Sequence, residues 1–217
     1  MRCRQELYEE QVKQWRNEDG TWRPLEYDSL QTPLVNAVIK ETLRLHPPLH
    51  SLMRKVTADV EVPKTFASPA SEPSLSESER KRNEGVSYVV PRGHFVLAAP
   101  GVSHVDPAVW GSDVMEFKPH RWIDGGMGTK EEVADEGEED YGWGKISKGG
   151  KSSYLPFGAG RHRCIGEQFA HVQLGTIIST LIRNYHWTLD NQKFPKQDYT
   201  TMIVMPERPR TVSWERR

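Results

Sequence analysis

Residues 157–166 read FGAGRHRCIG and place Cys164 between a glycine-rich turn and a long periodic apolar segment. The glycines allow the backbone to approach a sulfur atom or a flat ligand closely, because no Cβ stands in the way. The basic residues Arg161, His162 and Arg163 precede the cysteine, and neighbouring cations lower the pKa of a thiol. A helix that begins at Cys164 would add the positive end of its dipole. The stretch therefore predicts a thiolate that acts as a nucleophile, a redox thiol or a metal ligand.

The rest of the sequence bears on these alternatives for Cys164. A nucleophilic cysteine needs a histidine base, and the eight histidines leave this role open, although no protease signature surrounds the cysteine. Cys3 is the only other cysteine, so neither a disulfide framework nor a four-cysteine zinc site is indicated. The remaining role for a thiolate is axial ligation of haem iron. A buried apolar cysteine is the plain alternative.

Three helices are predicted from apolar spacing and from helix-breaking residues. Helical periodicity continues after Cys164 and predicts a helix over 165–183. Its repeating positions are Ile165, Phe169, Val172, Thr176, Ile177 and Leu181. A second helix is predicted over 33–45, where Pro33 suits the first turn and a pair of prolines ends the pattern. A short helix is expected over 5–16.

The segments between the helices are extended or polar. Residues 49–62 have strand character, and 87–100 predict a hairpin around a Pro-Arg-Gly turn. Residues 184–217 alternate as strands around TTMIVM. Two polar segments, 63–87 and 124–152, are predicted as flexible insertions. The fold class is therefore mainly α with small peripheral β-sheets.

The composition limits the classes of function. The 217 residues carry 29 Lys and Arg against 30 Asp and Glu, a balance that argues against a nucleic-acid partner. No run approaches the roughly 18 apolar residues that span a bilayer, and the polar N-terminus lacks the apolar region of a signal peptide. By itself, the sequence therefore describes a soluble chain.

Glu41 and Arg44 form a candidate ion pair on one face of the 33–45 helix. They are either a surface pair or a buried pair that fixes the fold, and a buried carboxylate would need a further donor. Arg121, within FKPHRW, is a candidate donor because arginine binds a carboxylate bidentately.

Three motifs in this order resemble those of the cytochrome P450 superfamily. The spacing Phe157-x-x-Gly160-x-His162-x-Cys164-x-Gly166 resembles its haem-binding loop. The Glu-x-x-Arg pair at 41–44 and the segment PHRW at 119–122 resemble the parts of its Glu-Arg-Arg cluster. The superfamily usually has arginine where this chain has His162. With that histidine, the loop is similar to the sterol 14-alpha-demethylase branch in its fungal form, as are residues 49–56 and 97–111.

The resemblance implies a role for each motif residue. Cys164 would be the proximal thiolate ligand of heme b (iron protoporphyrin IX), in a loop shaped by Phe157, Gly160 and Gly166. Arg54 and His162 would pair with the haem propionates.

Two further sets of residues receive roles from the resemblance. The Glu-Arg-Arg cluster of Glu41, Arg44 and Arg121 would be structural. Residues on the substrate side would line a long hydrophobic pocket for the sterol or an azole inhibitor. These are Leu49, His50, Ser51, Leu52, Met53, Thr200, Thr201, Met202 and Ile203.

The implied activity is oxidative removal of the sterol 14-alpha-methyl group, by a monooxygenase that uses NADPH-cytochrome P450 reductase. The implied substrate is lanosterol or eburicol, and the implied location is the cytosolic face of the endoplasmic reticulum membrane. Residues 1–217 would be a partial domain, the C-terminal portion, without the N-terminal membrane anchor and the central oxygen-activating helix. The alternatives are a non-catalytic fragment or pseudoenzyme that binds haem weakly or serves as an interaction module, and, more distantly, a thiol-redox or cysteine-nucleophile protein.

Overall fold

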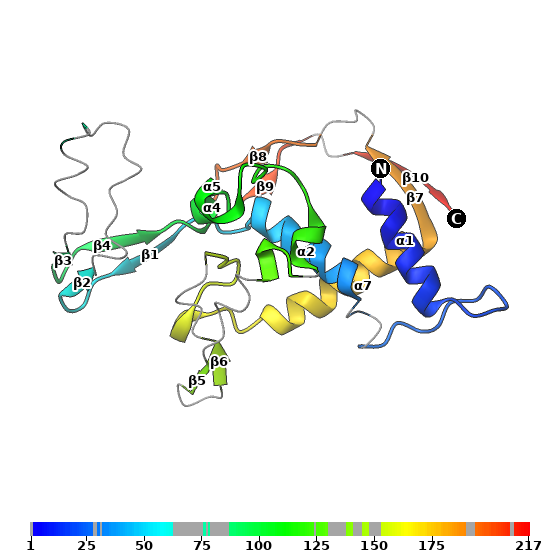
Figure 1. Cartoon of the computed structure of the whole chain (residues 1–217), viewed down its shortest axis with the longest axis horizontal. Coiled ribbons are helices and arrows are strands. Elements are labelled where there is room, and N and C mark those ends of the chain that lie inside the picture. The colour runs from blue at the N-terminus through cyan, green and yellow to red at the C-terminus, as the bar shows by residue number, and fades with distance from the viewer. Residues whose placement is uncertain are drawn as a thin grey trace. The chain divides into compact units, whose positions relative to one another are not determined.

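The computed structural model describes residues 2–27, 30, 32–62, 76, 78, 87–123, 125–129, 138–140, 145–147, 153–189, 194–208 and 211–217. The chain divides into two compact units, Met1–His50 with Ala99–Arg217, and Ser51–Ala98. The helices α1, α2 and α7 belong to the first unit, and the four strands β1 to β4 of the second unit form a β-ribbon (Figure 1). Among the described residues, no helix has the length and apolar character needed to cross a membrane.

Three helices form the frame of the first unit: α1 (Arg2–Trp15), α2 (Pro33–Leu45) and α7 (Glu167–Asn184). The prediction for 33–45 is confirmed, because Pro33 occupies the first turn and the chain leaves the helix at His46. The prediction that a helix begins at Cys164 is wrong. Cys164 to Gly166 lie in a turn, and Gly166 is the residue that precedes the first helical one.

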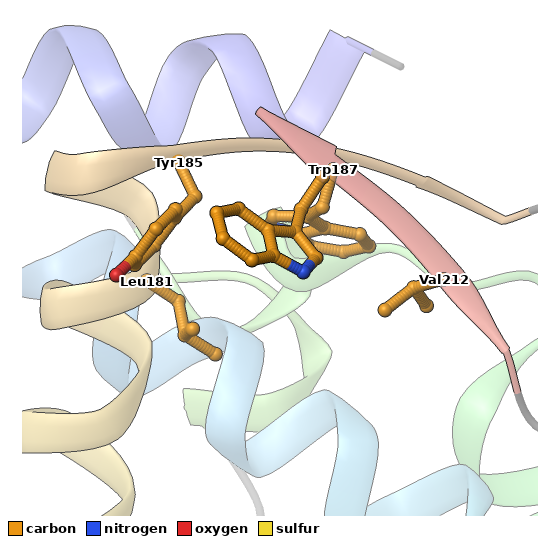
Figure 2. A pocket seen from close by; sticks show the side chains of 5 residues that line it. Leu181, Tyr185, Trp187 and Val212 are labelled. Atoms are coloured by element: carbon orange, nitrogen blue, oxygen red, sulfur yellow. The ribbon is translucent and has the colours of Figure 1, made fainter. Parts of the chain in front are cut away.

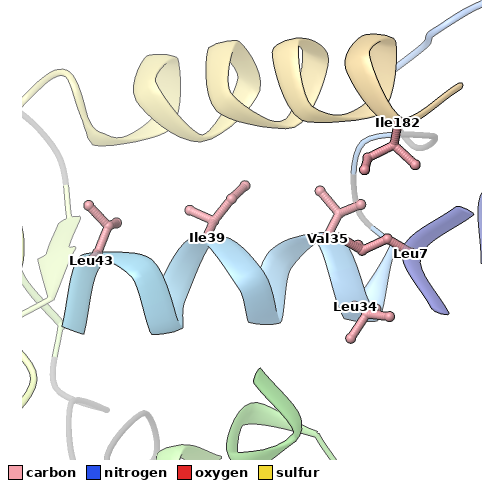
Figure 3. Packing of buried hydrophobic residues seen from close by; sticks show 6 residues of the cluster. All are labelled: Leu7, Leu34, Val35, Ile39, Leu43 and Ile182. Atoms are coloured by element: carbon pink, nitrogen blue, oxygen red, sulfur yellow. The ribbon is translucent and has the colours of Figure 1, made fainter. Parts of the chain in front are cut away.

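The three helices meet in one hydrophobic cluster (Figure 3). Val35, Ile39 and Leu43 lie four residues apart along α2, and in Figure 3 they point toward α7. Ile182 of α7 and Leu7 of α1 close the cluster at one end. This spacing is the one that places side chains on one helix face, so the apolar pattern explains the packing.

The first unit also contains four short helical turns and a second hydrophobic cluster that includes a residue of α2. The turns are α4 (Pro100–Ser103), α5 (Pro107–Trp110), η2 (Pro119–Trp122) and η3 (Gly160–His162). Asp106 begins α5 and accepts a hydrogen bond of 2.9 Å from the Ala108 N–H, as is usual for aspartate at a helix start. Ala37 of α2 packs with Trp110, Val114 and Trp122 in the second cluster.

The first unit also contains three antiparallel strand pairs. They are β7 (Tyr185–Leu189) with β10 (Val212–Arg216), β8 (Gln197–Asp198) with β9 (Met205–Pro206), and β5 (Glu138–Asp140) with β6 (Lys145–Ser147). The expectation of strands around TTMIVM is wrong for 200–204, which connect β8 to β9. The segment 124–152, predicted as flexible, contains the β5–β6 pair; its residues 124, 130–137, 141–144 and 148–152 lie outside the described part.

The second unit is a two-stranded ribbon, and here the predicted local hairpin is wrong. Its strands are β1 (Leu52–Lys55), β2 (Val60–Val62), β3 (Tyr88–Val90) and β4 (Phe95–Ala98). β3 pairs with β2 and β4 pairs with β1, so β3 and β4 run back along the two earlier strands instead of pairing with each other. The Gly93 N–H donates to the Val56 carbonyl at 2.8 Å, which continues the ribbon between the two ladders. The predicted insertion 63–87 lies outside the described residues except for 76, 78 and 87.

Candidate functional site

Cys164 lies in an exposed turn between η3 and α7. Its N–H donates to the Phe157 carbonyl at 2.8 Å. This hydrogen bond closes the loop of residues 157–164 that the motif predicted, called the cysteine loop or Cys164 loop below. Gly158 and Gly160 have φ angles of 75° and 60°. Residues with a Cβ rarely adopt such angles, which is the physical reason for glycine at these two positions.

Cys164 is exposed, and large hydrophobic residues that follow it are exposed as well. Ile165 is 103% exposed and Phe169 is 70% exposed, although both are large hydrophobic residues. Gly166 has no side chain, and a Cβ built there would lie 3.7 Å from the sulfur. Within the described ranges no group of three or more His, Cys, Asp or Glu could hold a metal ion. A lone thiolate fits a metal whose other ligands belong to a cofactor, as in haem.

The turn that carries Cys164 is tied to the first turn of α7. The Arg163 guanidinium donates to both carboxylate oxygens of Glu167, at 2.7 and 2.9 Å. Glu167 also lies at the positive end of the α7 dipole, where a carboxylate is favourable. The Phe157 ring packs against the His171 ring with centroids 5.5 Å apart, and burial lowers the pKa of His171. These contacts fix both ends of the cysteine loop relative to α7.

A buried carboxylate cluster lies on α2, centred on Glu41, which is fully buried. Arg44 donates to both of its oxygens at 2.9 Å, and the Arg121 Nε donates at 3.0 Å. The Trp122 indole and the Lys118 backbone N–H each donate at 2.9 Å. Burial raises the pKa of Glu41, but these hydrogen bonds outweigh it and hold the pKa below its ordinary value. The structure thus brings the sequence-predicted Glu41, Arg44 and Arg121 together around one ionised carboxylate.

Gly128→Ala tests how tightly Trp122 is held in this cluster. A Cβ at Gly128 would lie 2.5 Å from Trp122 Cε3, so the indole that donates to Glu41 would have to move. We expect the free energy of unfolding to fall by about 1–3 kcal/mol, as in other overpacked cores. Urea denaturation measures the change, and Met127→Ala, at an exposed neighbouring position, is the matched control. Equal stability of Gly128→Ala and wild type would show that Trp122 has room to shift.

One histidine connects the carboxylate cluster to the cysteine loop. The Arg44 Nη1 donates to the His104 carbonyl at 2.8 Å, and the His104 Nε2 accepts the Leu155 N–H at 2.8 Å. His104 is fully buried, and burial lowers its pKa to about 4. Sequence reasoning missed this residue, because its partners lie 51 and 60 positions away along the chain.

The residues expected at the haem propionates belong to different units. His162 is exposed in η3 of the first unit. Arg54 lies in β1 of the second unit, where its Nη1 donates to the Met53 carbonyl at 2.9 Å.

The residues expected on the substrate side are also divided between the units. Leu49 and His50 belong to the first, with Thr200, Thr201, Met202 and Ile203; Ser51, Leu52 and Met53 belong to the second. Within the first unit the Val204 N–H donates to the Pro48 carbonyl at 2.8 Å. The His50 and Tyr199 rings meet edge to face with centroids 5.6 Å apart. The structure therefore places the 48–50 segment beside the 199–204 turn, and adds Tyr199, an aromatic residue directly before the predicted threonines.

An apolar groove lies at the other end of α7 (Figure 2). It has a volume of about 460 Å³ and is lined by Leu181, Tyr185, Trp187, Val212 and Trp214. Leu181 lies 14 residues after Glu167 in α7, which separates it from the start of the helix by about 21 Å at the usual rise. The groove is therefore a feature distinct from the Cys164 loop.

The family model described as Cytochrome P450 matches residues 2–70 and 81–214. This chain belongs to the cytochrome P450 family. The match includes the Cys164 loop, the Glu41 cluster and the β-ribbon, and it omits residues 71–80 within the predicted insertion. P450 enzymes bind haem through a cysteine thiolate, and the exposed lone thiol of this chain fits that group.

Fungal sterol demethylases are similar to this chain along nearly its whole length. A lanosterol 14-alpha demethylase of Mycosarcoma maydis is 49% identical over 206 residues, 94% of this chain and 35% of the relative. One from Candida tropicalis is 44% identical over 214 residues, 98% of this chain and 36% of the relative. A sterol 14-alpha demethylase of Aspergillus flavus is 41% identical over 219 residues, 98% of this chain and 37% of the relative. The chain spans about a third of the length of these P450 relatives.

Proposed function

We propose that this chain is the haem-binding, C-terminal portion of a haem-thiolate monooxygenase of the sterol 14-alpha-demethylase type. The observation that carries the proposal is the exposed Cys164 in its glycine loop, in a chain 49% identical to a lanosterol 14-alpha demethylase. When bound, haem supplies the iron at which a P450 activates oxygen.

The residues of this chain would hold that group in defined ways. Cys164 would provide the thiolate to the iron of heme b. Phe157 would fix the loop through its carbonyl, and the glycines at 158 and 160 supply the positive φ angles that the loop needs. Gly160 and Gly166 would leave room for a flat macrocycle beside the sulfur. His162 and Arg54 would donate charge-assisted hydrogen bonds to the propionates.

The Glu-Arg-Arg cluster would serve as a structural support for this loop. Glu41, Arg44 and Arg121 are buried and saturate one another with hydrogen bonds, so they offer no free acid or base. Arg44 also reaches His104, which contacts the loop at Leu155.

The names of the relatives support a sterol substrate. We propose lanosterol or eburicol, bound on the side formed by His50 and by Thr200 to Ile203, where exposed apolar and small polar groups meet. The activity would be removal of the 14-alpha-methyl group with electrons from NADPH-cytochrome P450 reductase, and azoles would inhibit it. The location would be the cytosolic face of the endoplasmic reticulum membrane.

Ligation by Cys164 can be tested directly on the 217-residue chain. The protein is loaded with haemin and reduced, and its carbon monoxide difference spectrum is recorded. We expect the strongly red-shifted Soret band of thiolate-ligated haem, and its complete loss in Cys164→Ala. Cys3→Ala is the matched control, because Cys3 packs against the helical core rather than the loop, and it should keep the band.

Two results would contradict the proposal. A histidine-type or free-haem spectrum in the wild-type chain would favour the alternative of a non-catalytic fragment. Loss of the band in Cys3→Ala to the same degree as in Cys164→Ala would show that the effect is not specific to the loop cysteine.

A further inference from the structure

His104 has no part in the chemistry described above, yet it is one of the largest fully buried side chains. It follows α4, where its N–H donates to the Pro100 carbonyl at 2.9 Å. Its carbonyl accepts from Arg44 at 2.8 Å, and its ring Nε2 accepts from the Leu155 N–H at 2.8 Å. One residue therefore receives hydrogen bonds from the carboxylate cluster and from the segment that enters the cysteine loop.

The hydrogen bond from Leu155 requires a neutral His104 ring. A backbone N–H can only donate, so Nε2 must carry a lone pair, which assigns the proton to Nδ1. Nδ1 itself makes no hydrogen bond to a described residue. Burial lowers the pKa of His104 to about 4 and the Arg44 charge acts in the same direction, against the nearby carbonyls of Arg44 and Leu43. The ring is therefore neutral at neutral pH and able to accept.

Leu155 is where the cysteine loop leaves the helical core. Its carbonyl accepts the Gly158 N–H at 3.1 Å, and the next residue, Pro156, has no N–H to offer. Phe157 follows, and its carbonyl holds the Cys164 N–H. The neighbouring Tyr154 packs on the His104 ring with centroids 5.3 Å apart and donates through its hydroxyl to the Lys40 carbonyl at 3.1 Å. The start of the loop is thus held from α2 and from His104.

We propose that His104 is a positioning residue for the Cys164 loop, acting through the hydrogen bond between its Nε2 and the Leu155 N–H. Through Arg44 it joins this loop to the buried carboxylate cluster. The effect of this loop position on haem ligation rests on the proposed function. The role of His104 in holding the loop does not.

The test compares two substitutions in the full chain. His104→Leu keeps a side chain of similar volume that cannot accept a hydrogen bond. In His104→Gln, the side-chain Oε1 can accept the hydrogen bond from the Leu155 N–H. Val114→Ala removes core volume from the neighbouring cluster without touching the loop, and is the matched control. The first readout is amide hydrogen exchange at Leu155 and Gly158 in the haem-free protein. The second is the yield of the thiolate-type band after haemin loading.

His104→Leu should speed exchange at Leu155 and Gly158 about tenfold relative to Ile182 in the core, the effect of one lost hydrogen bond. It should also lower the yield of the thiolate band, and His104→Gln should restore both readouts. Unchanged exchange in His104→Leu, equal effects of the Leu and Gln substitutions, or the same selective change in Val114→Ala would overturn the proposal. If the wild-type chain gives no thiolate band, the proposed function fails, and the exchange readout still decides the role of His104.

Discussion

Glu41→Gln is expected to lower the free energy of unfolding by about 3–5 kcal/mol, the usual cost of removing one partner of a buried ion pair. The Glu41 carboxylate accepts hydrogen bonds from Arg44, Arg121, Trp122 and the Lys118 backbone. Its side chain is fully buried, so water cannot replace these donors. An amide of the same size removes the buried negative charge that both guanidinium groups contact. It also turns an N–H₂ group toward donors that need an acceptor.

Urea denaturation followed by circular dichroism measures this loss. Asp113→Asn is the matched control, since Asp113 is a second acidic partner of Arg121, 3.6 Å from its Nη2, but is partly exposed. Its substitution should change stability far less, because exposed ion pairs are screened by solvent. Comparable losses in the two variants would contradict a dominant role for the buried carboxylate.

Acidification from about pH 6.5 to pH 4 is expected to destabilise the fold by roughly 3 kcal/mol through His104 alone. The folded pKa of His104 is about 4, against an ordinary value of 6.5. Between these values the unfolded chain binds a proton that the folded chain does not, so a falling pH favours unfolding. Burial lowers the pKa of His46 and of His171 as well, and both act in the same direction.

The free energy of unfolding at a series of pH values tests this expectation. His104→Gln removes the titrating group and preserves an acceptor, so it should flatten the acid slope without abolishing the parts that belong to His46 and His171. An unchanged slope in His104→Gln would show that His104 does not titrate on unfolding.

Local sequence signals were sufficient where a proline or a short spacing determines the structure. Pro33 and the prolines after His46 fix the limits of α2, and its apolar positions four residues apart give the face that packs on α7. The three-residue spacing of Glu41 and Arg44 likewise fixes their contact on the helix.

Contacts between distant segments could not be derived in this way. The Lys118 and Trp122 donors to Glu41 and the Leu155 donor to His104 lie far along the chain, and no local pattern pairs them. The prediction of a local hairpin over 87–100 failed for a related reason, because the sequence between β3 and β4 offers a plausible turn. The competing pairing with β1 and β2 depends on a return from a distant segment, which strand propensity does not reveal. The glycine loop before Cys164 was predicted from its motif, whereas the start of α7 at Glu167 was not.

The constant register of the ribbon has a consequence for engineering this protein. Leu52 faces Ala98 and Val62 faces Tyr88, with equal stretches of 56–59 and 91–94 between the ladders, so the pairing itself sets the alignment. The register does not depend on the length of the connection from Val62 to Tyr88, because the entropic cost of closing a loop grows slowly, by about 0.6 kcal/mol for each doubling of its length. A fluorescent reporter or an affinity peptide placed there would leave the alignment of the strands intact, and would give a handle remote in sequence from Cys164.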